Sequence, residues 1–239
     1  MTDGKYGVGI TGGGWVATQH AKVYKKNINT EVLAVCDQTL ERAENFKKEW
    51  GLANAKIYDN YQKMLEQDNL DIVSICTPNY LHAEEGILAA QAKKHVYIEK
   101  PAAITLESLY SLQEEINKAG VKSMVSFELR WCPLLKIIKT LVDSGSIGDI
   151  FYSEIDYRSG MLAGWYSGFN WSRKKLTGGS SFLVAGCHAV DAMRWFLGRE
   201  AVEVCAYSGG WDKRYEYNAT NVAIIKFSDG IVGKSLSSI

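Results

Sequence analysis

A glycine-rich turn near the N-terminus constrains the fold of this chain more than any other segment. The segment Gly12-Gly-Gly14-Trp15-Val16-Ala17 fits the pattern G-x-G-x-x-A, between a strand-like run at 6–11 and a helix-like segment at 17–27. In that context the glycines permit a tight turn and close approach of the backbone to a pyrophosphate, and the alanine lets the helix pack on the sheet. We therefore expect a dinucleotide at the start of the helix, where backbone N–H groups point outward. The residues expected to bind it are Gly12, Gly14, Trp15 and Val16.

An acidic residue, Asp37, follows the second apolar run at 31–36. In dinucleotide-binding units such an acid lies about 20 residues beyond the glycines, somewhat nearer than here. Its carboxylate would accept hydrogen bonds from the adenosine ribose hydroxyls and repel a 2′-phosphate. This predicts NAD as the cofactor, with NADP less favoured. The alternative is a glycine-rich turn of another α/β protein, in which Asp37 caps a helix.

The first half of the chain alternates apolar runs with helical patterns. Runs that are apolar throughout, rather than alternating, are typical of parallel strands covered on both faces. We predict strands at 6–11, 31–36, 57–58, 70–76, 95–98 and 122–126, and helices at 17–27, 40–50, 61–66, 82–93 and 106–119. This repetition predicts a doubly wound Rossmann domain over residues 1–126.

The pattern changes over residues 127–239. We expect helices at 134–144 and 182–197, a strand at 150–158, a loop at 159–177, and strands at 202–208, 221–227 and 231–236. The dipeptide Asp229-Gly230 predicts a hairpin between the last two strands. The fold class is therefore α/β, with a C-terminal α+β domain on an open, mostly antiparallel sheet. We assign substrate binding and oligomerisation to this domain and expect it to be incomplete at its C-terminus.

Composition excludes several classes of partner. The chain has 27 Lys and Arg against 27 Asp and Glu, so its formal charge is zero and no basic field attracts nucleic acid or a membrane. No signal segment or membrane-spanning stretch is present, which predicts a cytoplasmic location. The five cysteines are widely spaced without C-x-x-C, an arrangement that argues against a disulfide framework or a metal site.

Three separated motifs resemble those of the Gfo/Idh/MocA oxidoreductases, which include glucose–fructose oxidoreductase and inositol dehydrogenase. They are Cys76-Thr-Pro-Asn79 followed by His82, Glu99-Lys100-Pro101, and Gly178-Gly-Ser-Ser181 leading into Gly186-Cys-His188-Ala-Val-Asp191. Arg130 and the turn at 145–148 also match the family's pattern. The resemblance covers essentially the whole chain.

The resemblance implies a role for each matching residue. Thr77, Pro78, Asn79 and His82 would line the cofactor, and Glu99 and Lys100 would lie near the nicotinamide ribose. Lys100 would bind the reacting hydroxyl, and His188 would accept or relay its proton. In this family the bond before the proline of E-K-P is often cis, so Pro101 would set the direction of the lysine. These roles suit the chemistry, because the cofactor accepts a hydride while a base accepts the hydroxyl proton, and histidine exchanges protons near neutral pH.

Two features depart from the family pattern. Many of its sugar and inositol dehydrogenases carry an aspartate one helical turn before the histidine, where this chain has Val184. Asp191 could partly replace that acid, bind substrate hydroxyls, or be a carboxylate of the helix surface. The chain also ends at Ile239 inside a predicted strand, whereas family members run on. A truncated record, a disordered remainder or a shortened relative would each explain this, and we favour the first.

The segment at 164–171 is rich in aromatic residues, which can stack on the C–H faces of sugars. Candidate substrate residues are Arg130, Trp165 and Asp191. The basic run at 173–175 would either receive an anionic group or be a solvated loop.

We expect an NAD(P)-dependent oxidoreductase that transfers a hydride between the nicotinamide and a hydroxyl or carbonyl carbon of a sugar or polyol. The alternatives are an NAD-retaining glycoside hydrolase and a non-catalytic sensor of NAD or a sugar. The family resemblance implies a homodimer or homotetramer formed through the C-terminal sheet.

Overall fold

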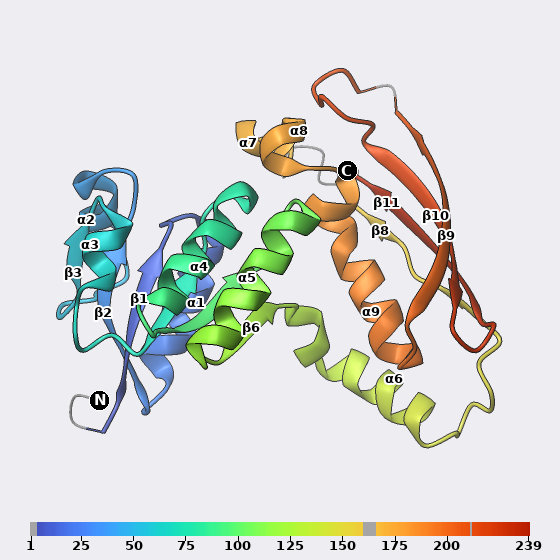
Figure 1. Ribbon diagram of the computed structural model, residues 1–239, viewed down its shortest axis with the longest axis horizontal. Helices are drawn as coiled ribbons and strands as arrows, with labels where there is room; N and C mark the ends of the chain where they lie inside the picture. The colour runs from blue at the N-terminus through green and yellow to red at the C-terminus, as the bar shows by residue number, and fades with distance from the viewer. Residues whose placement is uncertain (1–3, 160–165, 211) are drawn as a thin grey trace. The chain divides into compact units, whose positions relative to one another are not determined.

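The computed structural model describes residues 4–159, 166–210 and 212–239. It divides into two compact units, Met1–Ser126 and Phe127–Ile239. In Figure 1 the first unit runs from blue to green and the second from yellow-green to red. Within the described ranges, no helix combines the length and the apolar character that crossing a membrane requires.

The first unit is built on six parallel strands in the order β3-β2-β1-β4-β5-β6. The strands are β1 (Tyr6–Thr11), β2 (Thr30–Cys36), β3 (Lys56–Tyr58), β4 (Ile72–Ile75), β5 (His95–Glu99) and β6 (Ser123–Ser126). The predicted doubly wound sheet is confirmed. Its strand order reverses between β1 and β4, and in this fold the nucleotide crevice lies at that point, beyond the carboxyl ends of the strands.

Helices cover both faces of this sheet (Figure 1). They are α1 (Trp15–Lys26), α2 (Leu40–Glu49), α3 (Tyr61–Leu65), α4 (His82–Gln91) and α5 (Leu106–Ala119), with a 3₁₀ turn η1 (Asn79–Leu81). Side chains of α1 and α2 pack with Val8 and Ile10 on one face, whereas α3, α4 and α5 pack with Val73 and Ile75 on the other. Burial on both faces explains why these strands are apolar throughout.

The second unit is a mixed sheet with one long helix against it. Its strands are β7 (Tyr152–Glu154), β8 (Tyr157–Arg158), β9 (Ala201–Gly209), β10 (Thr220–Phe227) and β11 (Val232–Ser238). The helices are α6 (Pro133–Asp143), α7 (Asn170–Arg173), α8 (Lys175–Gly178) and α9 (Cys187–Leu197), with turns η2 (Glu128–Trp131) and η4 (Phe182–Gly186). Strands β9, β10 and β11 are antiparallel, and β7 and β8 pair with β11 in parallel. Met193 and Leu197 of α9 pack on Ile225 and Phe227.

The strand predicted at 150–158 is wrong, because two short strands occupy that segment. Between them, the carboxylate of Asp156 accepts a hydrogen bond from the Leu236 backbone N–H at 2.9 Å and two from Lys234 Nζ. The Asp156 side chain thus accepts the hydrogen bond from a β11 backbone N–H that a continuous strand would have accepted with its own backbone. The loop predicted at 159–177 is also corrected, since it contains the short helices α7 and α8.

The helix predicted at 182–197 is not a regular α-helix throughout. Its first part, η4, is a π-helix, and the α-helix begins at Cys187. At Gly186 the backbone lies close to β11: an added Cβ there would lie 2.5 Å from Ser237 Cβ. Widened turns of this kind occur often at functional sites. The turn changes the spacing between Val184 and His188 from that of the regular helix expected from the sequence.

Candidate functional site

The glycine turn at the end of β1 leaves backbone groups open on one side and tightly packed on the other. Gly12 has a φ of +82° and donates its N–H to Cys36 O at 2.9 Å. A Cβ at Gly12 would lie 2.8 Å from the backbone of Cys76 and Thr77, so the turn has no room for a side chain. A Cβ at Gly14 would meet no described atom within 4 Å, and Gly14 precedes the first turn of α1. This open helix start can receive an anion.

Asp37 follows β2 and joins the glycine turn to the next loop. Its Oδ2 accepts the N–H of Gly13 at 2.8 Å, and its Oδ1 accepts from Arg42 Nε at 2.7 Å. Asp37 is not the N-cap of α2. Thr39 caps that helix, because its side chain accepts a hydrogen bond from the backbone N–H of Arg42. The partly exposed guanidinium of Arg42 is a neighbour that the sequence analysis did not identify.

The loop after β4 carries Thr77, Pro78 and Asn79. Asn79 is buried, and its Nδ2 has no hydrogen-bond partner among the residues that the structure describes. Thr77 donates its hydroxyl to Glu85 Oε2 at 2.8 Å. Burial raises the pKa of Glu85 to about 7, although hydrogen bonds from Thr77 and Thr11 oppose the shift. Sequence reasoning missed this carboxyl group, which lies behind the loop on α4.

His82 is 1% exposed and fixes two loops to each other. Its Nδ1 lies 2.6 Å from Pro101 O, and its Nε2 lies 2.7 Å from Thr77 O. Burial lowers the pKa of His82, while the two carbonyl oxygens work in the opposite direction. The imidazole therefore supports the loops from inside. The peptide bond between Lys100 and Pro101 is cis, as the resemblance implied.

Lys100 follows a buried hydrogen-bonded pair, Glu99 and His20, at the end of β5. Glu99 Oε1 lies 3.0 Å from His20 Nε2, and Glu99 Oε2 accepts the backbone N–H of Lys100 at 3.2 Å. The other ring nitrogen of His20 lies 2.8 Å from Ser74 Oγ. Burial opposes ionisation of Glu99, but hydrogen bonds from His20 and Ser126 lower its pKa. His20, on α1, is a further residue that the sequence analysis did not identify.

These groups gather at one edge of the sheet, since β1, β2, β4 and β5 are parallel and their carboxyl ends carry the glycine turn, Asp37, the loop with Asn79, and Lys100. Three observations fit a dinucleotide: the open backbone at Gly14, the packed turn at Gly12, and the buried amide of Asn79, which bonds to none of the described residues. Exposed N–H groups and a buried amide are the groups that a pyrophosphate and a nucleoside would satisfy.

His188 lies in the second unit, on α9, and is 3% exposed. Its ring stacks on Tyr157 with centroids 5.4 Å apart and meets Phe127 edge-on at 6.1 Å. Its Nε2 lies 3.7 Å from Glu128 Oε1, on the 3₁₀ turn η2. Sequence reasoning did not identify Glu128 or Tyr157, because neither belongs to a motif quoted for the family.

Two of the predicted substrate residues, Arg130 and Asp191, bind each other. Arg130 Nε and Nη2 donate to the two carboxylate oxygens of Asp191 at 2.8 and 2.6 Å. Asp191 thus pairs with Arg130, whereas the carboxylate of Glu128 lies beside His188. Val184 is buried in the π-helical turn. Trp165, the third candidate substrate residue, lies outside the described residues.

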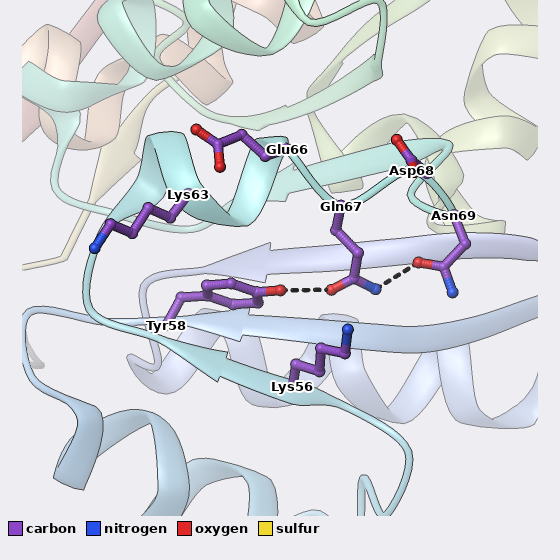
Figure 2. A pocket seen from close by; sticks show the side chains of 7 residues that line it. All are labelled: Lys56, Tyr58, Lys63, Glu66, Gln67, Asp68 and Asn69. Atoms are coloured by element: carbon purple, nitrogen blue, oxygen red, sulfur yellow. Dashed lines mark hydrogen bonds between the residues drawn. The ribbon is translucent and has the colours of Figure 1, made fainter.

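Figure 2 shows a hollow beside the edge strand β3 that the candidate site does not use. Lys56, Tyr58, Lys63, Glu66, Gln67, Asp68 and Asn69 line it. Its polar groups bond to one another: Tyr58 donates to Gln67 Oε1 at 2.9 Å, and Gln67 Nε2 donates to Asn69 Oδ1 at 2.6 Å. None of its lining residues belongs to the motifs.

Across the part of the chain that is described, no cluster of three or more His, Cys, Asp or Glu could hold a metal ion.

The fold and the glycine turn define a Rossmann-type dinucleotide-binding unit followed by an α+β unit. Two family profiles match these parts: "Oxidoreductase family, NAD-binding Rossmann fold" over residues 6–127, and "GFO/IDH/MocA C-terminal domain" over residues 135–239. The chain therefore belongs to the Gfo/Idh/MocA oxidoreductase family. It is 30% identical to D-glucoside 3-dehydrogenase of Escherichia coli (strain K12), in a match that covers 96% of this chain and 69% of that protein. Matches to three further curated relatives cover 51% to 55% of their lengths.

Solved structures show the same arrangement of elements. The WlbA dehydrogenase from Bordetella pertussis, in complex with NADH and UDP-GlcNAcA, matches with a TM-score of 0.89 and 26% identity, over 100% of this chain and 68% of that chain. Scyllo-inositol dehydrogenase from Lactobacillus casei, with bound NAD(H) and scyllo-inositol, matches with a TM-score of 0.83 and 25% identity, over 98% and 69%.

Proposed function

We propose that this protein transfers a hydride between NAD and a hydroxyl-bearing carbon of a sugar or polyol. The observation that carries the proposal is the set of groups at the carboxyl ends of β1, β2, β4 and β5, where the glycine turn, Asp37, Asn79 and Lys100 occur together. The names of the relatives support the substrate class. Each acts on, or is solved with, a glycoside, a sugar nucleotide or an inositol.

The residues of the first unit divide the work of holding NAD. Gly12 forms the tight turn that brings the chain to the pyrophosphate, and Gly14, Trp15 and Val16 bind it with the backbone at the start of α1. Asp37 accepts hydrogen bonds from the hydroxyl groups of the adenosine ribose, and its negative charge disfavours the 2′-phosphate of NADP. Thr77, Pro78 and Asn79 line the crevice after β4, where the Asn79 amide has a donor to give. His82 and Glu99 hold these loops in place through their buried hydrogen bonds.

NAD, when bound, supplies the hydride acceptor. Lys100 binds the reacting hydroxyl, and the Glu99–His20 pair keeps its backbone fixed. His188 accepts the hydroxyl proton. Arg130 and Asp191 offer the substrate a paired cation and anion that can bond to its hydroxyls. Trp165 is proposed to stack on the sugar ring. A positioned base of this kind contributes about 10² to 10⁴ in rate.

The test is the absorbance of reduced nicotinamide when the protein, NAD and a panel of free sugars, glycosides and inositols are mixed. We expect turnover with at least one member of the panel, and a fall of at least about a hundredfold in Lys100→Met, the change expected on losing a group that positions the reacting hydroxyl. Cleavage of an aryl glycoside with no net change in the cofactor would instead establish the glycoside-hydrolase alternative. Binding of NAD or a sugar, unchanged in Lys100→Met and without turnover, would establish the sensor.

Self-association through the sheet of the second unit is part of the same proposal. Strand β9 is exposed along its length, and its side chains Val202, Val204 and Tyr207 are 61%, 59% and 80% exposed. Apolar side chains gathered on one exposed strand favour burial against another surface. Light scattering of the full protein should give the mass of a dimer or tetramer, and a monomer at micromolar concentration would count against this part of the proposal.

A further inference from the structure

The helix that carries His188 lacks the acid that relatives are expected to place one turn earlier. Val184 occupies that position, is 1% exposed, and lies in a π-helical turn. A carboxylate nevertheless approaches the imidazole from another element: Glu128 Oε1 on η2 lies 3.7 Å from His188 Nε2. The two residues are 60 positions apart in the sequence.

A second pair fixes the turn that presents this carboxylate. Arg130 lies two residues after Glu128, and Asp191 lies three residues after His188 on α9. The guanidinium of Arg130 donates two hydrogen bonds to the carboxylate of Asp191, at 2.8 and 2.6 Å. Planar, bidentate pairs of this kind constrain orientation as well as distance. Turn η2 is therefore joined to α9 at two points, and the Arg130–Asp191 pair keeps Glu128 beside the histidine.

The remaining neighbours of His188 set the plane of its ring. Tyr157 stacks on one face of the imidazole, and Phe127 meets it edge-on. Glu128 from η2 and Tyr157 from β8 are titratable groups that face the ring from neighbouring elements. The Tyr157 hydroxyl lies 3.4 Å from that of Tyr166. A half-turn about the Cβ–Cγ bond would preserve the stacking but move Nε2 to the other side, so a carboxylate beside Nε2 favours one of the two orientations.

We infer that Glu128 is a positioning residue for His188, replacing from the 3₁₀ turn the acid that position 184 does not supply. Its carboxylate holds Nε2 in one direction and stabilises the imidazolium formed when His188 accepts a proton. Arg130 and Asp191 hold the turn in place. The role in catalysis rests on the proposed function, whereas the interaction of Glu128 with His188 can be measured without turnover.

The direct test is a titration of the imidazole nitrogens by ¹⁵N NMR on the full protein. The chain has only four histidines, so His188→Gln assigns the signal. Glu128→Gln should lower the titration midpoint of His188 by about half a pH unit, the size expected for a partly exposed pair. Glu203→Gln, which removes an exposed acid from β9, is the matched control and should leave the midpoint unchanged. A midpoint in Glu128→Gln equal to that of the control overturns the inference.

Kinetics separate positioning from simple structural support. In Glu128→Gln we expect kcat to fall about three- to tenfold, the acidic limb of the pH profile to move down with the imidazole midpoint, and the Kd for NAD to stay unchanged. Glu128→Asp, which keeps the charge on a shorter side chain, should give intermediate values of kcat and of the midpoint, and it serves if the glutamine variant does not fold. Loss of NAD affinity together with kcat, at an unmoved midpoint, overturns the inference. If the wild type shows no turnover with any sugar, the proposed function fails, and the NMR titration still decides the interaction.

Discussion

Substitution of Gly12 by alanine tests the geometry of the glycine turn. The residue has a φ of +82°, and an added Cβ would lie 2.8 Å from the backbone of Cys76 and Thr77. A non-glycine residue at positive φ costs about 1–2 kcal/mol, and forcing extra atoms into a packed region costs about 1–3 kcal/mol. Lower entropy of the unfolded chain returns less than about 1 kcal/mol. We therefore expect Gly12→Ala to lower the free energy of unfolding by about 2–4 kcal/mol.

Gly14 provides a matched control in the same turn. Its φ is −78°, and a Cβ there would have no described atom within 4 Å. Alanine is a poorer N-cap than glycine, but it also restricts the unfolded chain, so the free energy of unfolding should change by less than about 1 kcal/mol. The Cβ would, however, project from the backbone that is proposed to approach the pyrophosphate. Gly14→Ala should therefore raise the Kd for NAD at least about tenfold, which corresponds to about 1.4 kcal/mol.

Urea denaturation followed by circular dichroism measures the first effect, and titration calorimetry with NAD measures the second. The two variants should separate: Gly12→Ala loses stability, while Gly14→Ala keeps stability and loses NAD affinity. A Gly12→Ala variant within about 1 kcal/mol of the wild type would refute the strain argument. A Gly14→Ala variant that binds NAD like the wild type would refute the location of the pyrophosphate.

Two further predictions concern buried or paired carboxyl groups of the first unit. Burial raises the pKa of Glu85 from 4.5 to about 7, so the folded protein favours the protonated carboxyl group. The contribution of this group to the free energy of unfolding is fully present below about pH 4.5. It is lost as the pH rises through 7, and the total loss is roughly 3 kcal/mol. Glu85→Gln should remove this dependence and be the more stable protein at pH 8 in urea denaturation, and equal pH dependence in both proteins would contradict it. Asp37→Ser removes the carboxylate but leaves Arg42, so the ratio of the Kd values for NADP and NAD should fall at least about tenfold by calorimetry. An unchanged ratio would show that Asp37 does not select the cofactor.

The Rossmann half could be predicted from sequence because its signals are local. Apolar runs mark the strands. The residue that ends a helix comes directly after it in the chain, as Gly120 does in the left-handed conformation after α5. The glycine turn and Asp37 also lie within one strand–helix–strand unit, so the predicted residues meet at one edge of the sheet. The cis bond at Pro101 followed from the family resemblance.

The parts that sequence reasoning missed depend on contacts between distant residues. The break between β7 and β8 requires Asp156 to meet Leu236, 80 positions later. The π-helical turn at η4 reflects the close approach of Gly186 to Ser237. Glu128 lies beside His188 across 60 positions of sequence, and the Arg130–Asp191 pair joins the same two elements, η2 and α9. Periodicity and motif spacing carry no information about such pairs, since each residue taken alone is an ordinary polar or small residue.

Net transfer of a hydride from a sugar or polyol to NAD is the reaction that we propose for this protein. Its most direct measurement uses the member of the sugar panel with the highest turnover, deuterated at every carbon, and follows the mass of the nicotinamide product. We expect reduced cofactor that is heavier by one deuterium, formed in amounts that far exceed the enzyme, and almost none of it from Lys100→Met. Cofactor that stays oxidised and undeuterated while the sugar is bound or cleaved would contradict it.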